Sequence, residues 1–132
     1  MTSDSRPHRG KPIRLHIAFL LITPLAAAIL VPWWAMTHGI TWTEISAMIA
    51  LWIVTGMGIT VGYHRMFAHC SFKVPAPLRF FAAIFGGAAW QGSAMQWSSG
   101  HRYHHNKVDT DLDPYNPKRG FWWSHMGWVM FE

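Results

Sequence analysis

The sequence ISAMIALWIVTGMGITVGYH, at residues 45–64, decides the fold because it is mostly apolar and carries no formal charge. About 20 such residues cross the hydrocarbon core of a bilayer as one helix. We therefore predict a membrane span over 45–64. The next residues, RMFAH at 65–69, bring the first charge after this run and a second histidine. The span thus leads directly into a polar segment that carries histidine.

A second apolar run lies upstream of this span. Residues 15–43 contain no Asp, Glu, Lys or Arg, and their apolar part, 15–36, is long enough for another span. Pro24 and Pro32 either kink this helix or mark its end, which membrane helices tolerate. A cleaved signal peptide has a shorter apolar run followed by a cleavage site of small residues. We therefore predict a retained span.

Charge and aromatic residues set the expected orientation. Trp33, Trp34 and Trp42 flank the link between the spans, where aromatic belts lie. The link has no Lys or Arg, whereas residues 1–14 carry four and the chain after the second span carries seven. Because basic residues stay in the cytoplasm, we predict a transmembrane helical hairpin with both chain ends cytoplasmic. The expected fold is all-α and integral to the membrane, with a basic tail at 1–14 and cytoplasmic or interfacial helices after the hairpin.

Composition excludes several classes of protein. The chain is 51% hydrophobic and only 13% charged, whereas soluble domains carry about 25% charged residues. The net charge of +5 does not indicate a nucleic-acid partner, because an apolar run separates the basic leader from the other basic residues. Cys70 is the only cysteine, which excludes an intrachain disulfide and a zinc site built from several cysteines.

The remaining segments read as short interfacial elements. Residues 80–97 are apolar but rich in Gly and Ala, and they predict a helix that lies in the interface or packs on the hairpin. Residues 106–120 are a polar loop, and 121–131 form an uncharged aromatic stretch expected at the interface.

Five of the nine histidines form two clusters, His64–His69 and His101–His105. On an α-helix, the three histidines of the second cluster fall within an arc of about 100° and face one point. In the first cluster, the five-residue gap makes the two rings diverge on a regular helix. They converge only if the helix ends or is distorted between them, and we expect an end because His64 closes the predicted span.

The two clusters predict a metal site. Neutral imidazole suits iron, copper, nickel and zinc. Five ligands exceed the four of a structural zinc ion, so two ions are the simpler interpretation. Iron is favoured because a histidine-rich site at a membrane can activate oxygen beside a lipid chain, although copper fits the residue type. The other interpretation is a solvated surface patch. We interpret His8, His16 and His38 as hydrogen-bonded structural histidines.

Asp109, Asp111 and Asp113 do not form an EF-hand. Such a loop needs Gly at its sixth position and Glu at its twelfth, where this chain has Pro114 and Gly120. The three carboxylates are either acceptors for the N–H groups of metal ligands or part of a solvated loop.

Two stretches then resemble a known family. GYHRMFAH at 62–69 resembles the first histidine box of the membrane fatty-acid desaturases, and HRYHH at 101–105 resembles the second. DPYNPKRGFWWSHMGW at 113–128 is similar to the stretch typical of the delta-9, acyl-CoA desaturase branch. The resemblance covers about 50–132, and it makes 15–132 the N-terminal part of a desaturase domain.

The resemblance implies that a di-iron centre uses O2 and two electrons to place a cis double bond, at the delta-9 position, in a saturated acyl chain. Trp97 and Gln91 would line the acyl tunnel near its bend, and His125 would be a packed or hydrogen-bonded residue. The implied ligands of the two iron ions are His64, His69, His101, His104 and His105.

The implied partners are a fatty-acyl substrate, O2, the lipid bilayer and an electron donor such as ferredoxin, a cytochrome b5-like protein or a reductase. Animal acyl-CoA desaturases have Arg-Asp where this chain has Ser99-Gly100, and Asn where it has Gly92. The acyl carrier therefore stays open between CoA, acyl carrier protein and a membrane lipid. The Ser-Gly form resembles bacterial members, which predicts a bacterial inner membrane.

The third box of the family, which would be a further His-x-x-His-His after the one at 101–105, and its downstream spans do not occur in these 132 residues. We therefore expect this chain alone to be inactive. The alternatives are a histidine-box lipid hydroxylase, a non-catalytic haem-binding membrane hairpin, and a truncated product without activity. Product analysis distinguishes the hydroxylase, which forms hydroxy-acyl chains, from a desaturase, which forms unsaturated ones. A haem Soret band in the absorbance spectrum would indicate the haem-binding hairpin.

Overall fold

The computed structural model describes residues 10–131. They fall into two compact units, one made of residues up to 39 together with 107 onward, and the other of 40–106. Between residues 10 and 131 the chain is predominantly helical and forms no β-strand, which confirms the predicted all-α fold. His8 and most of the basic tail lie outside the described residues.

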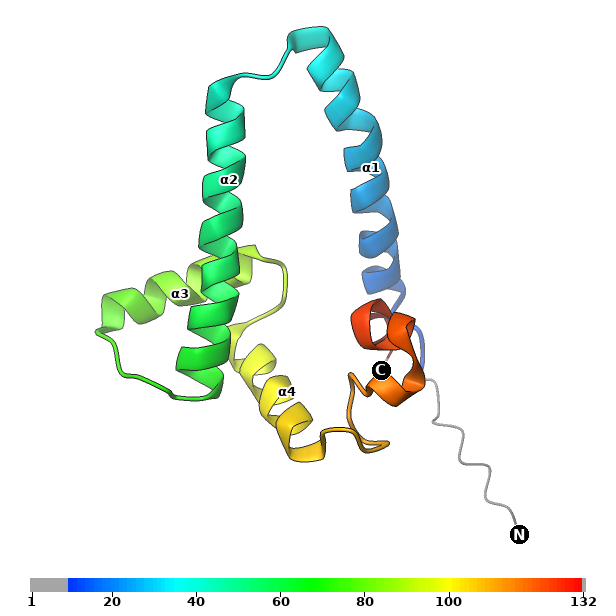
Figure 1. The fold of residues 1–132 in the computed structure, drawn as a ribbon, viewed down its shortest axis with the longest axis vertical. Helices are drawn as coiled ribbons and strands as arrows, with labels where there is room; N and C mark the ends of the chain where they lie inside the picture. Colours follow the sequence, from blue (N-terminus) through cyan, green and yellow to red (C-terminus); the bar gives the residue numbers. More distant parts are fainter. Residues whose placement is uncertain (1–9, 132) are drawn as a thin grey trace. The chain divides into compact units, whose positions relative to one another are not determined.

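The first unit contains helix α1, Arg14–His38, a long apolar helix near the start of the chain (Figure 1). It is long and apolar enough to cross a membrane, and none of its residues is buried. Pro24 and Pro32 both lie inside the helix, so neither marks its end. The helix predicted over 15–36 is therefore present and slightly longer than expected.

Two histidines of this unit have structural partners, as predicted. The Nδ1 atom of His16 lies 2.8 Å from the carbonyl oxygen of Val129, which ties the start of α1 to the end of the described chain. The ring of His38 stacks on Trp34 with 4.0 Å between ring centroids. The His38 Nδ1 atom also lies 2.7 Å from the Thr37 hydroxyl oxygen, so both histidines are hydrogen-bonded, as predicted.

The second unit begins with α2, Trp42–Met57, which continues without a break into the π-helix η1, Gly58–Ala68. Together they form a second helix long and apolar enough to cross a membrane. This helix starts before the predicted span because Thr41 and Glu44 form a capping box. The Thr41 N–H donates to the Glu44 carboxylate at 2.7 Å, and the Glu44 N–H donates to the Thr41 hydroxyl at 3.3 Å.

Helix α3, Ala76–Ala88, packs against the lower part of α2 and against η1 (Figure 1). The two backbones touch, since a Cβ atom at Gly58 would lie 2.5 Å from the Gly86 nitrogen. This packing against the second apolar helix confirms one of the two interpretations of 80–97, and the interfacial position stays a prediction. The segment is not one helix, because a turn after Ala88 separates α3 from the next helix.

That turn contains two residues with positive φ, Trp90 at 59° and Gly92 at 84°. Helix α4, Ala94–Lys107, follows it and carries the second histidine cluster. The polar loop predicted at 106–120 is present and ends in the short 3-10 helix η2, Pro117–Arg119. The aromatic stretch after it is helical, through η3, Trp123–Gly127, and α5, Trp128–Met130.

Candidate metal centre

Four histidines from the two clusters converge within the second unit. One ring nitrogen from each lies within 4.8 Å of all the others. The Nε2 atom of His69 is 3.1 Å from that of His64 and 3.2 Å from that of His101. The Nε2 atoms of His101 and His105 are 3.0 Å apart. Residues that are 32 positions apart in the sequence therefore present their ring nitrogens to one small volume.

A π-helix brings the first pair together. The His69 N–H donates to the His64 carbonyl oxygen at 3.0 Å, which is the i→i+5 hydrogen bond of a π-helix. Residues five apart would point about 140° away from each other on an α-helix, whereas this wider turn places them on nearly the same face. Of the two conditions for convergence, distortion of the helix is therefore the one observed. The predicted helix end at His64 is wrong, because the helix continues to Ala68.

The second pair comes from an ordinary α-helix, because His101 and His105 are one turn apart on α4. His104 lies beside the group and is not one of its four members. Its ring centroid is 6.1 Å from that of His101 and 5.5 Å from that of His105. The expectation that all three imidazoles face one point holds for two of them, and a ligand role for His104 stays a prediction.

The spacing of the four nitrogens fits a metal ion better than a hydrogen-bond network. A neutral imidazole offers a single N–H, so the Nε2 atom of His69 cannot serve both of its close nitrogen neighbours as a donor. Two nitrogens bound at about 2.1 Å to one ion lie about 3 Å apart when they subtend a right angle. The observed separations of 3.0–3.2 Å match that arrangement.

The environment keeps these rings in the form that binds metal. Burial, and then the neighbouring histidines, lower the pKa of His101 to about 4. The pKa of His69 is lowered by partial desolvation and then by His64 and His105. Metal binding requires neutral imidazole, so at neutral pH these two imidazoles need not lose a proton to bind a metal ion.

The two residues predicted to line the acyl tunnel are bound to each other. The Trp97 indole N–H donates to the side-chain oxygen of Gln91 at 2.8 Å. The Trp97 ring also stacks on His101, with 4.9 Å between centroids and 21° between planes. The pair therefore lies directly against the histidine group, and its place in an acyl tunnel stays a prediction.

The polar loop is a self-supporting structure. Asp113 is buried, and its carboxylate accepts the N–H groups of Asp109 and Tyr115 at 3.1 and 3.0 Å. Asp109 and Asp111 are exposed, as the interpretation of a solvated loop requires. Asn116, also buried, donates to the Thr110 carbonyl oxygen at 2.7 Å. These bonds explain why Asp and Asn occur here without requiring a metal.

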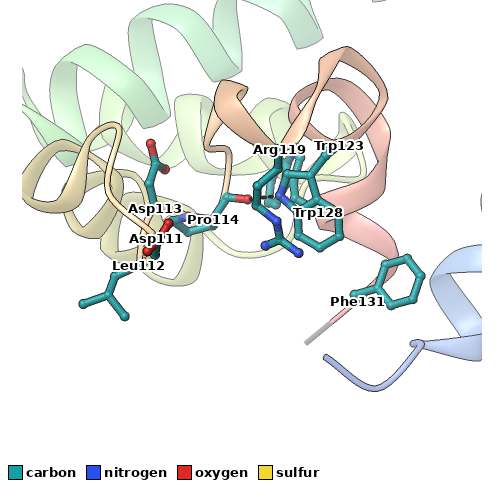
Figure 2. Close-up of a pocket in the computed structure, with 8 residues that line it drawn as sticks. All are labelled: Asp111, Leu112, Asp113, Pro114, Arg119, Trp123, Trp128 and Phe131. Carbon is teal, nitrogen blue, oxygen red and sulfur yellow. Dashed lines mark hydrogen bonds between the residues drawn. The ribbon is translucent and has the colours of Figure 1, made fainter. Parts of the chain in front are cut away.

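A hollow of about 280 Å³ lies beside this loop, and none of the predicted site residues lines it. Figure 2 shows the Arg119 guanidinium lying against the Trp123 ring, and its Cζ atom is 3.3 Å from the ring centroid. The Trp123 N–H donates to the Pro114 carbonyl oxygen at 3.0 Å. His125, as predicted, is packed: it stacks on Phe121, and its Nδ1 atom is 2.9 Å from that residue's carbonyl oxygen.

Sequence reasoning missed the residues that join the two boxes. The Arg102 guanidinium donates to the carbonyl oxygens of Phe67 and Ala68 at 3.3 and 3.5 Å, and so caps the end of η1. Tyr63 and Ser98 form a second connection on the buried side, with the Ser98 hydroxyl 3.4 Å from the Tyr63 carbonyl oxygen. No periodicity or spacing in the sequence indicates these bonds, because they join segments more than 30 residues apart.

Comparison with known proteins identifies the family of this chain. The family model described as fatty acid desaturase matches residues 42–132. The chain belongs to the fatty acid desaturase family. A Schizosaccharomyces pombe desaturase, named as a probable acyl-CoA desaturase, is 49% identical over 82 residues, which are 62% of this chain and 17% of that protein.

Two lipid-linked relatives match to a similar degree. The sn-1 stearoyl-lipid 9-desaturase of Anabaena variabilis is 42% identical over 93 residues, which are 70% of this chain and 34% of that desaturase. Delta-9 acyl-lipid desaturase 1 of Arabidopsis thaliana is 48% identical over 89 residues, which are 67% of this chain and 29% of that desaturase. The chain thus spans about a third or less of the length of these desaturases.

Proposed function

We propose that this chain is the part of a membrane fatty-acyl desaturase that binds iron through its first two histidine boxes. The reaction joins O2, two electrons and two protons with a saturated –CH2–CH2– unit, and yields a cis –CH=CH– unit and two molecules of water. The double bond is placed at the delta-9 position, in line with the names of the Anabaena variabilis and Arabidopsis thaliana relatives reported above.

The convergence of four imidazoles from two distant segments carries this proposal. His64, His69, His101 and His105 hold one ion, and His104, on the same helix, is available to the second ion of the pair. When bound, iron supplies the oxidation, by O2, of carbons that no acid or base in the chain could activate. The protein's own contribution is to direct the four rings at one point and to lower the pKa of His69 and His101, which favours their neutral form.

The acyl chain is positioned by shape. It offers no polar group near the carbons that react, so its placement depends on the walls of the site. The Trp97–Gln91 pair is such a wall, because it is fixed by a hydrogen bond and stacked against a proposed iron ligand. A change in either residue would therefore move the position of the double bond.

The candidates for the acyl carrier are CoA, acyl carrier protein and a membrane lipid. The relatives support CoA and a lipid about equally, because acyl-CoA and acyl-lipid desaturases match this chain to a similar degree. At Gly92 the φ angle of 84° suits both Gly and the Asn of animal enzymes, since Asn tolerates this conformation. The backbone can thus be the same in both, while this chain offers no amide side chain there to an acyl carrier.

The proposed setting is a bacterial inner membrane with both chain ends in the cytoplasm. Electrons reach the iron from ferredoxin, a cytochrome b5-like protein or a reductase on that side. The basic residues that follow the second apolar helix support this orientation.

A chimaera tests the proposed reaction. Residues 42–132 would replace the matching segment of the Saccharomyces cerevisiae acyl-CoA desaturase 1, to which this chain is 51% identical over 79 residues, in cells that lack their own copy. We expect growth without added unsaturated fatty acid and cis-unsaturated products by gas chromatography–mass spectrometry. The same chimaera with His101→Ala should give neither.

The products also separate the alternatives. Hydroxy-acyl chains in place of unsaturated ones would support the lipid hydroxylase. A chimaera that binds iron as the parent does, but changes no acyl chain, would contradict the proposal.

A further inference from the structure

Tyr63, which directly precedes the proposed ligand His64, is buried more completely than any ligand. Only 1% of its surface is exposed, and it is among the largest fully buried side chains between residues 10 and 131. It lies in the middle of η1, the π-helix that carries the first histidine box. A buried hydroxyl must find a hydrogen-bond partner, so the partners of Tyr63 show what the residue connects.

The Tyr63 hydroxyl connects η1 to the two segments that follow. Its oxygen lies 3.2 Å from the carbonyl oxygen of Ala83 in α3, and 3.2 Å from that of Gly92 in the turn before α4. The single hydroxyl proton is shared between these two acceptors. The Tyr63 carbonyl oxygen in turn accepts the hydroxyl of Ser98 in α4. One residue thus links the helix of the first box to the helix of the second.

The surroundings of the ring are shaped to receive it. Gly86 faces the ring, and a Cβ atom at that position would lie 2.3 Å from the Tyr63 Cε1 atom. On another side the ring contacts Trp97, with 6.0 Å between centroids. Any residue larger than glycine at position 86 would therefore collide with the ring.

We propose that Tyr63 is a positioning residue that holds the first histidine box in its π-helical register. This inference rests on the metal site proposed above. A π-helix is rarer and less favourable than an α-helix, so its register needs support from outside the helix. Relaxation toward an α-helix would turn His64 and His69 away from each other. The Tyr63 hydroxyl opposes it by fixing η1 to α3 and to the turn at Gly92.

The substitution Tyr63→Phe tests this role, because it keeps the ring in place and removes only the hydroxyl. The chain would be purified metal-free in detergent and titrated with Co2+, followed by its visible d–d absorption. We expect the affinity to fall about 10-fold, as for residues that orient metal ligands, and the bands to change in position and intensity. A residue needed only for folding would change the unfolding temperature but leave the spectrum of the bound ion unaltered.

Tyr103→Phe is the matched control. Tyr103 lies on α4 between two histidines of the second box, but it is 45% exposed, and no hydrogen bond of its hydroxyl occurs among the described residues. We expect its Co2+ affinity and spectrum to equal those of the unmodified chain. Ser98→Ala, which removes the bond to the Tyr63 carbonyl oxygen, should weaken Co2+ binding in the same direction and by less.

Two results would overturn the inference, and they are distinguishable. If the unmodified chain binds Co2+ and both Tyr63→Phe and Ser98→Ala bind it equally well with the same spectrum, Tyr63 does not position the box. If the unmodified chain itself binds no Co2+, the proposed metal site fails, and the role of Tyr63 fails with it.

Discussion

The two histidine boxes reach the same point by opposite means. The second box uses the regular α-helix α4, in which His101 and His105 are one turn apart and their Nε2 atoms are 3.0 Å apart. The first box needs a π-helix, because His64 and His69 are five positions apart and still come within 3.1 Å. One geometry follows from local spacing, whereas the other requires support from the rest of the unit.

The two boxes should therefore differ in how sensitive metal binding is to substitutions around them. Box two should tolerate changes around it as long as α4 stays helical. Box one depends on contacts with distant segments: the glycines of η1 pack against α3, and Arg102 caps the end of the helix. Substitutions of similar size should therefore have larger effects on metal binding when they touch the supports of the first box.

The largest effect is expected from removing the histidine at the centre of the group. His101→Ala deletes the nitrogen that lies close to those of both His69 and His105. We expect Co2+ or Fe2+ affinity to fall more than about 100-fold, beyond the loss seen for residues outside the ligand shell. His104→Ala, on the same helix but outside the group, should keep most of the affinity for the first ion. Isothermal titration of the two variants checks this, and equal losses would show that the group is not the binding unit.

The next largest effect is expected where η1, the helix of the first box, packs closely against α3. A Cβ atom at Gly58 would lie 2.5 Å from the Gly86 nitrogen, whereas nothing lies within 4 Å of one at Gly56. Because backbone atoms cannot move aside cheaply, Gly58→Ala should destabilise the fold by about 1–3 kcal/mol. Gly56→Ala, two residues earlier in the same helix, should be neutral or stabilising by up to about 1 kcal/mol. Unfolding in detergent measures both, and equal stabilities would contradict the close approach of η1 and α3.

A smaller effect is expected at the cap of the π-helix. Arg102→Gln removes the charged donor to the Phe67 and Ala68 carbonyl oxygens. Since these bonds are long and the side chain is exposed, the loss should be at most about 1 kcal/mol, with a few-fold weaker metal binding. Arg65→Gln is the control, because the Arg65 side chain is exposed and has no hydrogen bond or ion pair within residues 10–131. Indistinguishable metal affinities for the two variants would show that the Arg102 cap does not contribute to metal binding.

A separate prediction concerns the pH dependence of the stability of the metal-free chain. Burial and the neighbouring histidines hold the pKa of His101 at about 4, below its ordinary value of about 6.5. Between these values the unfolded chain binds a proton that the folded chain does not, so stability falls as pH drops from 6.5 toward 4 and is constant above 6.5. His101→Gln should flatten this slope. Unfolding temperatures measured at several pH values check this prediction. If the substitution leaves the dependence of stability on pH unchanged, groups other than His101 cause it.

Much of this fold could be predicted from the sequence. The two apolar helices and the loop at 106–120 follow from composition, and the α-helical pair of the second box follows from its spacing. The start of α2 could also have been predicted, since Thr41 and Glu44 have the spacing of a capping box.

The rest depends on contacts that a sequence pattern does not contain. The five-residue gap between His64 and His69 showed that the helix must change, but not that it would continue as a π-helix, because that choice depends on Gly58, Tyr63 and their partners in α3. For the same reason, the place where α3 ends and α4 begins was not predicted. Helical spacing alone also put His104 with its neighbours, whereas the structure places it beside the group.

X-ray absorption spectroscopy of the purified chain loaded with one equivalent of Fe2+ or Co2+ tests the central claim most directly. The claim is that both boxes hold the same ion. It predicts the scattering of about four imidazoles, reduced to the same extent by His64→Ala in the first box and by His105→Ala in the second. A spectrum with two imidazoles, or one that changes with only one of the two substitutions, would show that the boxes bind metal separately and would contradict the account.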